Sequence, residues 1–380
     1  MDALKVLAVG DPAVYVYTDP KYGIISRFVR EKQFQVDFHI VPFTDYYPSM
    51  MKSLAETHEY DIVMVAGHLW LKDLVKNGYL ARVQYHSHYH KETIMQPVLE
   101  EMKIDGQPYL YPSFCDGHIF VYRKSIVEPV LGFKLGKVID TDMIIFLSKI
   151  VDGIDGMQAI ALKAHPSEIF LDFLPYLRNE GVEAFDSQTY EPTFNNEAGR
   201  KALEKYISLR QYAPEDTVHY GNDEVREAFQ KKKVAMTVTW GGQLGFLMDE
   251  RCLDPDDVGF AVIKTAWNVT WSFAIDRHSP RKEIANEFLT YLNSPKVDRI
   301  VGGYAGSAIT KTAYLLDSAR YPWYEVHRLL LETYAKPLPM MERASDKLAP
   351  LYHHVHQALI GKESVTEALE RAEKEIREII

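Results

Sequence analysis

Short apolar runs and helical periodicity alternate over the first 80 residues, a pattern typical of a parallel sheet with crossover helices. The runs predict buried strands at residues 6–9, 36–41 and 62–65. Between the second and third, apolar residues recur at helical spacing: Tyr47, Met50, Met51 and Leu54. Asp45 stands where the N-cap of this helix is expected. The pattern predicts a βαβαβ unit whose loops after the strands gather at one edge of the sheet.

The rest of the chain continues to alternate strands and helices. Further strands are predicted at residues 119–122, 234–238, 258–263 and 271–275, and helices at 196–212 and 282–292. Ser364 and Glu367 have the spacing of a capping box before a terminal amphipathic helix. The predicted fold class is α/β. Because the sequence contains no internal repeat and no low-complexity linker, we expect two interleaved domains rather than tandem ones.

Composition excludes several classes of protein. A chain of 380 residues with 47% hydrophobic and 25% charged residues is typical of a globular protein. The net charge of −10 removes the general attraction to a phosphate backbone, so we expect no nucleic-acid partner. No stretch approaches the roughly 20 consecutive apolar residues of a membrane-spanning helix.

The two cysteines and the first residues carry little functional information. Cys115 and Cys252 make neither a disulfide framework nor zinc-finger spacing. We expect two buried small side chains, and a single bridge between them stays open. Met1 is followed by a polar and then strand-like segment, without a basic region or an apolar core. The prediction is that an export signal is absent from this sequence.

Catalytic motifs are absent from the sequence, which favours a protein that is not an enzyme and has no cofactor. Residues 132–137 read GFKLGK, one residue short of a phosphate-binding loop and without the Ser or Thr that would hold magnesium. Acid and base residues from distant positions can still meet in a fold. A glycosidic hydrolase therefore stays open as an alternative.

Histidines occur in two groups that have metal-compatible spacing. His86, His88 and His90 alternate, and His353 and His356 are one helical turn apart. Neither group has a Cys or carboxylate at a familiar ligand spacing. We therefore predict a polar loop and a solvated helix face, without a metal site.

Aromatic residues gather where the predicted strands end. Tyr15 follows the first strand, Phe43 the second and Trp70 the third. Trp240 follows the strand at 234–238. Trp267 lies before the strand at 271–275, and Trp271 begins that strand. Open α/β sheets bind ligands beyond the carboxyl ends of their strands. The carboxylates that accompany these rings are Asp11, Asp45 and Asp116. Flat apolar faces and hydroxyl acceptors together predict a site for a polyol or sugar.

Several segments resemble one known family. They are residues 60–83 (YDIVMVAGHLWLKDLVKNGYLARV), 111–127 (YPSFCDGHIFVYRKSIV), 227–243 (EAFQKKKVAMTVTWGGQ), 281–295 (RKEIANEFLTYLNSP) and the closing GKESVTEALERAEKEI. In order and spacing they are similar to the extracytoplasmic solute-binding proteins of ABC sugar importers, the family-1 group related to maltose-binding protein. The likeness runs over nearly the whole chain.

This resemblance implies two α/β lobes of the periplasmic-binding-protein class II fold, joined by three chain crossings near residues 112–117, 263–268 and 309–314. Lobe one would hold residues 1–112 and 268–310, and lobe two residues 113–267 and 311–380. The resemblance also implies a monomer that closes on a solute and delivers it to the membrane permease subunits of an ABC transporter. It places the protein outside the cytoplasm, either in the periplasm or lipid-anchored at the cell surface.

The expected solute is a mono- or oligosaccharide that binds in the cleft between the lobes. The resemblance matches Asp116 to an acidic position of that cleft. The full set of predicted ligand-binding residues is Asp11, Tyr15, Phe43, Asp45, His68, Trp70, Asp116, Trp240, Gly241, Trp267, Trp271, Tyr304 and Trp323. Trp240 is expected to stack on the solute, so its loss should weaken binding and leave the fold intact. A cationic solute, such as a polyamine or quaternary amine, stays open because rings and carboxylates suit it equally.

Overall fold

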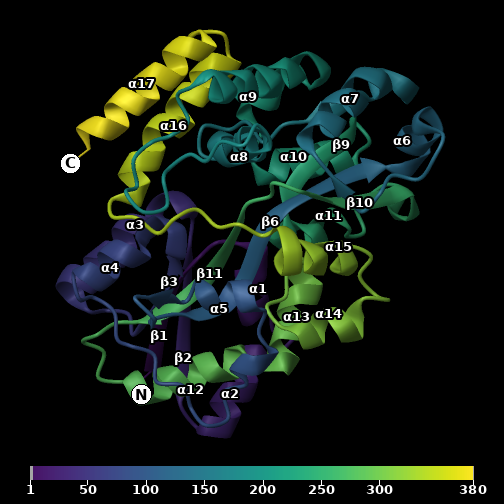
Figure 1. Cartoon of the computed structure of the whole chain (residues 1–380). Coiled ribbons are helices and arrows are strands. Elements are labelled where there is room, and N and C mark those ends of the chain that lie inside the picture. Colours follow the sequence, from purple (N-terminus) through teal and green to yellow (C-terminus); the bar gives the residue numbers. More distant parts are fainter. Residues whose placement is uncertain (1–2, 380) are drawn as a thin grey trace. The chain divides into compact units, whose positions relative to one another are not determined.

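The computed structural model describes residues 3–379, which form two compact α/β units (Figure 1). Unit 1 contains the described residues up to Asp116, together with Val269–Arg328 and Met340–Glu342. Unit 2 contains Gly117–Asn268, Leu329–Pro339 and the described residues from Arg343 onward. The chain therefore crosses between the units near Asp116, Asn268 and Arg328, with a short return at residues 340–342.

The sheet of unit 1 begins with three parallel strands, which confirms the predicted βαβαβ pattern. β1 (Ala3–Val9) pairs in parallel with β2 (Gln35–Val41) and with β3 (Ile62–Ala66). The strand order continues through β11 (Asn268–Ile275), antiparallel to β3, to β6 (Tyr111–Arg123).

Helices and a small hairpin complete unit 1. They are α1 (Pro12–Thr18), α2 (Ile24–Lys32), α3 (Phe43–Lys52), α4 (Lys72–Lys76), α5 (Gln96–Glu100), α12 (Lys282–Leu292), α13 (Pro295–Ala305), α14 (Lys311–Asp317) and α15 (Tyr324–Leu329), with β4 (Lys103–Ile104) and β5 (Gln107–Pro108).

The sheet of unit 2 is built on the second half of β6. β10 (Val258–Ile263) and β9 (Val234–Trp240) pair antiparallel to β6 on its two sides. β8 (Gln158–Ala161) lies parallel to β9, and β7 (Val138–Ile139) parallel to β10. The helices of this unit are α6 (Lys124–Leu131), α7 (Thr141–Val151), α8 (Ile169–Asn179), α9 (Glu197–Ser208), α10 (Asn222–Gln230), α11 (Leu244–Leu247), α16 (Ala344–Leu359) and α17 (Val365–Glu378).

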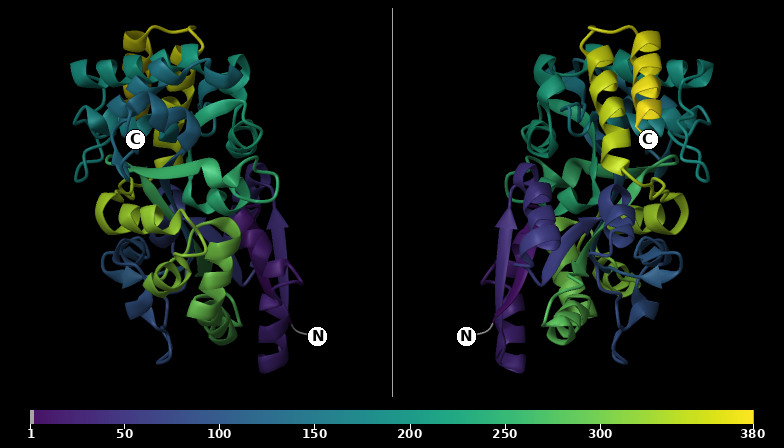
Figure 2. Two further views of the ribbon diagram at one scale, coloured as in Figure 1. Left: turned by 90° about the vertical axis from the view of Figure 1, so that its right-hand side faces the viewer. Right: turned by 90° about the vertical axis from the view of Figure 1, so that its left-hand side faces the viewer.

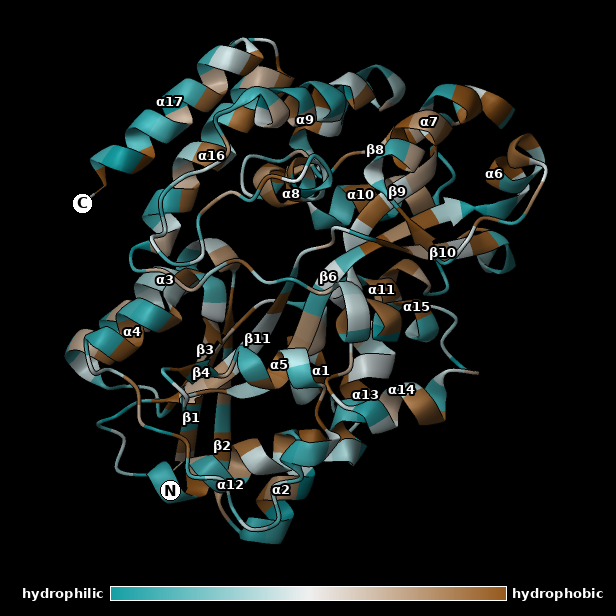
Figure 3. Ribbon diagram, in the orientation of Figure 1, coloured by the Kyte–Doolittle hydropathy of each residue, from teal (hydrophilic) through white to brown (hydrophobic). Residues whose placement is uncertain are grey.

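Hydrophobic patterning explains how these elements pack. β3 and β9 are buried along their whole length and appear as hydrophobic ribbons in Figure 3. α17 is polar on its outer face and buries a single stripe, which is Ala368, Leu369, Ala372 and Ile376. Its capping box forms as predicted: Glu367 N–H donates to Ser364 Oγ and Ser364 N–H donates to Glu367 Oε2. α16 and α17 lie side by side (Figure 2).

One predicted helix start is wrong. Pro42 is the N-cap of α3, and Asp45 lies inside the first turn, where its backbone N–H donates to the Pro42 carbonyl oxygen. β2 ends at Val41 and only Pro42 separates it from Phe43, so the helix starts two residues after the strand and before Asp45. Asp45 is exposed, and its negative charge in the first turn favours the positive end of the helix dipole.

The third chain crossing differs from the predicted one. Residues 309–314 lie within unit 1, and the chain leaves that unit only after Arg328. The reason is the buried carboxylate of Asp298, which accepts hydrogen bonds from Ile309 N–H (2.8 Å), Thr310 N–H (3.0 Å) and the Thr310 hydroxyl (2.5 Å). These bonds fix the turn after α13 to unit 1.

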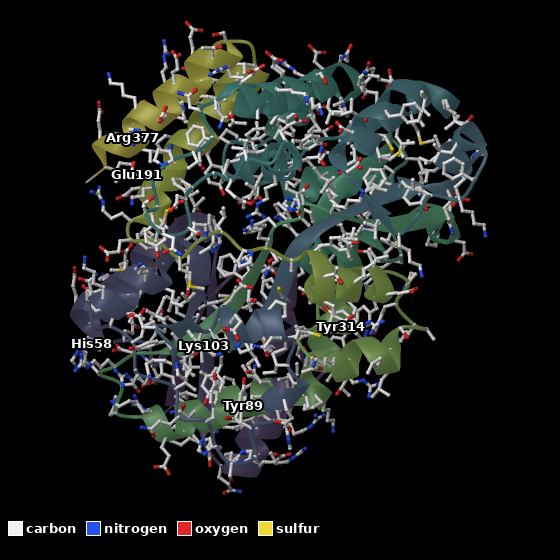
Figure 4. The ribbon with its side chains drawn as sticks, viewed as in Figure 1. His58, Tyr89, Lys103, Glu191, Tyr314 and Arg377 are labelled. Atoms are coloured by element: carbon white, nitrogen blue, oxygen red, sulfur yellow. The ribbon has the colours of Figure 1, made fainter. Side chains whose placement is uncertain are left out.

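The segment after this turn is fixed to the same unit. The hydroxyl of Tyr314, labelled in Figure 4, donates to the Ala308 carbonyl oxygen at 2.7 Å and lies 2.8 Å from His327 Nδ1. The predicted lobe two began at residue 311, whereas in the structure residues 311–328 belong to unit 1.

Two further observations bear on the sequence predictions. Cys115 and Cys252 are both buried free thiols, in different units, so the open question of a bridge is settled against it in the structure. Among residues 3–379, no helix has the length and apolar character needed to cross a membrane.

Candidate functional site

Predicted ligand residues of unit 1 collect at the edge of the sheet where the parallel strands end. Asp11 is the N-cap of α1 directly after β1, Phe43 opens α3 after β2, and Trp70 lies in the π-helical turn Gly67–Leu71 after β3. β11 runs antiparallel, and its Trp271 pairs with Ala66, the last residue of β3. Trp271 therefore comes to the same edge from the opposite chain direction.

Six rings at this edge form an aromatic edge cluster, which consists of Phe43, Tyr46, Tyr47, Trp70, Phe114 and Trp271. The Trp70 ring centroid lies 6.0 Å from that of Tyr46, 5.4 Å from that of Tyr47 and 6.1 Å from that of Trp271. Trp271 in turn lies 6.4 Å from both Phe43 and Phe114. These separations are typical of stacked and edge-to-face aromatic pairs.

The aromatic edge cluster is graded from buried to exposed. Trp70 is 6% exposed, whereas Phe43 is 50% and Tyr47 44% exposed. Tyr46 anchors the cluster, because its hydroxyl donates to the Met64 carbonyl oxygen and accepts from Met64 N–H, both at 2.6 Å. The exposed rim presents flat apolar faces of the kind that C–H surfaces of a sugar contact.

Three members of this cluster, Tyr46, Tyr47 and Phe114, are not among the ligand residues predicted from the sequence. The sequence pattern places Tyr47 on the apolar stripe of its helix, but in α3 Tyr47 is 44% exposed, whereas Tyr46 and Met50 are buried. Phe114 lies inside the long strand β6, two residues before Asp116, and not at the end of a predicted strand. Their closeness to Trp70 and Trp271 follows from sheet pairing, which one sequence does not reveal.

The predicted carboxylates and Tyr15 have defined local roles. Asp11 Oδ1 accepts a hydrogen bond from Ala13 N–H at 2.8 Å and so caps α1. Tyr15 on α1 is 45% exposed, and its hydroxyl lies 2.7 Å from where a Cβ at Gly10 would be. Any larger residue at position 10 would displace that ring. Asp116 is buried, at the end of unit 1.

His68 lies in the turn beside Trp70 but does not carry charge near neutral pH. It is 5% exposed, and burial lowers the pKa of its imidazole to about 3. The neutral imidazole is therefore a polar but uncharged group. In the same unit, the carboxylate of Glu101 accepts hydrogen bonds from Thr270 N–H at 2.8 Å and from the Thr270 hydroxyl at 2.9 Å.

The structure places Tyr304 and Trp323 apart from the contacts of the aromatic edge cluster. Tyr304 on α13 packs edge-to-face against Tyr22 at 5.5 Å. Trp323 is 3% exposed, its indole N–H donates to the Gly306 carbonyl oxygen at 2.8 Å, and it belongs to unit 1 rather than to the predicted lobe two. Tyr304 thus packs α13 against the segment before α2, and Trp323 packs against the end of α13.

Unit 2 brings together Trp240, Trp267 and a histidine that was not predicted. Trp240 ends β9 and is 5% exposed, and its ring centroid lies 5.5 Å from Trp267 and 4.7 Å from His118. β9 pairs with β6 so that Trp240 is opposite His118. Gly241 is buried in the turn that follows.

Both ring nitrogens of His118 take part in hydrogen bonds, and the ring is neutral. Its Nδ1 accepts from Trp267 N–H at 3.0 Å, so the ring proton lies on Nε2, which donates to the Leu171 carbonyl oxygen at 2.9 Å. Burial, with the nearby charge of Lys163, lowers its pKa to about 3. With both nitrogens engaged, His118 positions Trp267 and is neither a base nor a metal ligand.

Charged groups surround Trp240. The ammonium of Lys163, a fully buried residue, lies 3.6 Å from the centroid of the Trp240 ring, and the Trp240 indole N–H donates to the carboxylate of Glu168. Burial raises the pKa of Glu168, and Lys163 opposes that shift. Burial likewise raises the pKa of Asp172 to about 6, again against the charge of Lys163.

These contacts correct the expectation for Trp240. A ring that carries an ammonium on its face and a carboxylate on its N–H is part of a polar network, and its removal would leave both charges without that partner. We therefore expect the loss of Trp240 to disturb the fold of unit 2 as well as any binding.

A cavity lies elsewhere in unit 1. Its volume is about 920 Å³, and its basic lining comes from Arg82, Arg277 and Lys282. Leu80, which also lines it, bridges to Asp276, the residue that follows β11. The cavity is thus near the end of β11 that is opposite Trp271, and none of the predicted ligand residues lines it.

Neither histidine group forms a metal site in the part of the chain that the structure describes. The rings of His86 and His88 stack on each other at 5.3 Å within a loop, and His356 on α16 contacts the Val218 carbonyl oxygen at 3.3 Å. A histidine that sequence reasoning passed over, His354, lies between the carboxylates of Glu363 and Glu375.

Comparison with known proteins gives one family match. The model of the bacterial extracellular solute-binding protein family matches residues 18–299, more than half of the chain. The mannitol-binding protein of Pseudomonas aeruginosa is 24% identical over 232 residues, which are 58% of this chain and 53% of that protein. The chain thus matches about half the length of this curated relative.

Solved structures are similar over the full length. The maltose-bound MalE3 protein of T. maritima has a TM-score of 0.88 at 17% identity and covers 100% of both chains. A solute-binding protein of an ABC transporter from Agrobacterium vitis, with bound D-mannitol, has a TM-score of 0.83 at 19% identity and covers 100% of this chain and 98% of that one. These likenesses confirm the predicted fold class.

Proposed function

Because the chain belongs to the bacterial extracellular solute-binding protein family, we propose that it captures a small neutral polyhydroxylated solute and delivers it to the membrane subunits of an ABC importer. Membership of a solute-binding family agrees with the prediction that the chain is not an enzyme. The observation that best supports a solute of this class is the aromatic edge cluster of unit 1. Its exposed rim of Phe43 and Tyr47 lies where open α/β sheets bind ligands.

Rings of both candidate regions lie close in sequence to the chain crossings. Phe114 and His118 flank the first crossing at Asp116, and Trp267 and Trp271 flank the second at Asn268. Phe114 and His118 are each two positions from Asp116, whereas Trp267 directly precedes Asn268 and Trp271 follows it by three positions. A solute that binds better to one arrangement of the units than to another shifts the population toward it, and we propose this shift as the signal for the transporter.

The proteins similar to this chain support a neutral solute. The names and bound ligands given above are mannitol, maltose and D-mannitol, all of which are uncharged and rich in hydroxyl groups. We extend this class to the present chain, either as a sugar or as a sugar alcohol. We also propose that it acts as a monomer outside the cytoplasm, in the periplasm or attached to the membrane by a lipid.

The two alternative functions have less support. A cationic solute would have to compete with Lys163 for the ring of Trp240, because an ammonium already lies on that ring. A glycosidic hydrolase would need Asp11 or Asp116 as a proton donor. Asp11 instead accepts a backbone hydrogen bond from Ala13 N–H as the N-cap of α1.

The proposal is tested by thermal shift and calorimetry with D-mannitol, maltose and spermidine. A solute that binds the folded chain alone raises its melting temperature. We expect a rise with at least one of the two neutral compounds and none with spermidine. Chromatography should recover the neutral compound unchanged, and small-angle scattering should give the mass of one chain and a smaller radius in its presence. A rise with spermidine alone, or cleavage of maltose, would reject the proposal.

A further inference from the structure

The cavity of about 920 Å³ in unit 1 is lined by none of the residues of the aromatic edge cluster. Its walls come from the loop at residues 78–86, from the first two turns of α12 and from Arg277, which follows β11 by two residues. All of these segments belong to unit 1, so the cavity is complete within one unit. Its volume lies within the range of roughly 300–1,000 Å³ that is typical of small-molecule sites.

Two arginines of the lining have unpaired guanidinium groups. Within residues 3–379, the side chains of Arg82 and Arg277 make no hydrogen bond and no ion pair, and both are exposed. Arg277 Nη1 lies 3.0 Å from where a Cβ at Gly78 would be, so this guanidinium lies against the loop that carries Arg82. Two cationic groups without an acidic partner thus come from different elements to the same cavity.

Further polar groups of the lining also lack partners in the described part of the chain. His86 Nε2 is buried and has no hydrogen-bond partner there, and the Gln84 amide and the Tyr109 hydroxyl make no hydrogen bond with the protein. A buried polar atom that is left without a partner costs free energy. A ligand that hydrogen-bonds to these groups would recover that cost.

The charge of the lining is positive although the chain is acidic. Arg82, Arg277 and Lys282 face a single acidic residue, Glu283, whereas the whole chain has a net charge of −10. Lys282 Nζ is held in place, because it donates to the carbonyl oxygens of Arg277 (2.9 Å) and Ser279 (2.7 Å). No side chain caps the start of α12 at this cavity, so the positive end of the helix dipole adds to the local field. Such a field attracts an anion.

We propose that this cavity binds a small organic anion that carries at least two carboxylate or phosphate groups. A guanidinium pairs with either group through two parallel hydrogen bonds, and two unpaired guanidinium groups suit a ligand with two anionic ends. Val75, Leu80 and Ala81 add apolar surface to the lining, and a single inorganic ion would not fill the volume. Both features favour a carbon skeleton between the anionic groups. The site is separate from that of the neutral solute and does not depend on it.

Calorimetry on the unmodified chain tests this proposal with citrate, fructose 1,6-bisphosphate and inorganic phosphate. We expect at least one of the two organic anions to bind with one molecule per chain, and more tightly than inorganic phosphate. Binding of citrate identifies carboxylates as the recognised groups, and binding of the bisphosphate identifies phosphates. If neither organic anion binds, or if inorganic phosphate binds as tightly as they do, the proposal is rejected.

Arg82→Gln and Arg277→Gln test whether the anion binds in this cavity. Because neither guanidinium has a partner in the described chain, both variants should keep the melting temperature of the unmodified chain. We expect each variant to lower the affinity for the organic anion by about 10-fold, as for a lost hydrogen bond between charged groups, and the double variant to lower it further.

Arg30→Gln is the matched control. Arg30 lies on α2 of unit 1, is exposed, has no partner among residues 3–379 and does not line the cavity. The variant removes the same charge from the same unit, and we expect it to leave the affinity unchanged. An equal loss of affinity in Arg30→Gln, or an unchanged affinity in the double variant, would show that the anion does not bind in this cavity and would overturn the proposal.

Discussion

The two units hold their candidate tryptophans in opposite ways. In unit 1, Trp70 and Trp271 touch other rings, and the cluster ends in Phe43 and Tyr47, which are about half exposed. In unit 2, Trp240 touches the ammonium of Lys163 and the carboxylate of Glu168 as well as rings. Unit 1 therefore presents partly exposed apolar ring faces, whereas the tryptophan of unit 2 is held within a buried network of charged groups.

Each unit also buries one carboxyl group whose pKa is raised to about 6, chiefly by burial. In unit 1, Asp298 accepts three hydrogen bonds from one turn, at Ile309 and Thr310. In unit 2, Asp172 accepts from Lys163 N–H and from the Tyr206 hydroxyl. The first carboxyl fixes the path of the chain, and the second fixes the lysine that lies on Trp240.

The largest expected effect is on the stability of unit 1. Trp70→Ala removes a nearly buried indole that contacts three other rings, so we expect a loss of about 3–5 kcal/mol in the free energy of unfolding. Urea denaturation followed by circular dichroism measures it. Leu253→Ala, at an exposed position of unit 2, is the control that should cost little. A loss under 1 kcal/mol for Trp70→Ala would show that the aromatic edge cluster is not a packed unit.

How much of this comparison was predictable from the sequence depends on the kind of contact. Strands such as β10, with the bounds predicted from its apolar run, and the helix after Ser364 follow from local pattern. The gathering of Phe43 and Trp70 at one sheet edge also followed, because parallel strands end on the same side. The family and the fold class could likewise be predicted from the sequence.

Contacts that depend on which strands pair in the folded chain could not be predicted from the sequence. Lys163 and Glu168 surround Trp240 only because β8 lies beside β9, and no spacing in the sequence links residues more than 70 positions apart. The sequence analysis includes Trp323 among the ligand residues and assigns its segment to the second lobe. The turn held by Asp298 instead keeps that segment in unit 1, where the indole is used for packing.

The second effect is on the pH dependence of stability. The pKa of Asp298 is about 6 in the folded chain and near 4 when unfolded, so between these values the folded state holds a proton that the unfolded state has lost. Raising the pH through this window therefore lowers the free energy of unfolding, by up to roughly 3 kcal/mol for this group.

Asp298→Asn should flatten that dependence. The variant loses stability at every pH because an amide accepts fewer hydrogen bonds, but its change between pH 4 and pH 7 should be smaller than that of the unmodified chain. Urea denaturation at both values measures the difference. Asp172→Asn should flatten the curve in the same direction, and equal slopes for all three chains would contradict the assignment.

The third effect separates the polar contacts of Trp240 from its packing. Trp240→Phe keeps an aromatic face for the ammonium of Lys163 and removes the N–H that donates to Glu168. We expect a loss of about 1–2 kcal/mol in the free energy of unfolding, as for one hydrogen bond to a charged group. Trp240→Ala should cost more, because the ring face is lost as well. Equal costs for the two variants would mean that the N–H contact, and not the ring face, supplies the stability.

The smallest effect is on binding alone and concerns the exposed rim of unit 1. Phe43→Ala removes a ring that is 50% exposed and whose centroid lies 6.4 Å from that of Trp271, so the fold should lose little stability. If a solute lies on this rim, its binding free energy should weaken by about 0.5–1.5 kcal/mol, the range for one aromatic contact.

The matched control is Phe133→Ala, which removes a ring that is 60% exposed in unit 2 and should not change the affinity. Calorimetry with D-mannitol compares the two variants. An unchanged affinity for Phe43→Ala would assign binding to the polar contacts of unit 2 and leave the rim of unit 1 as a packing surface.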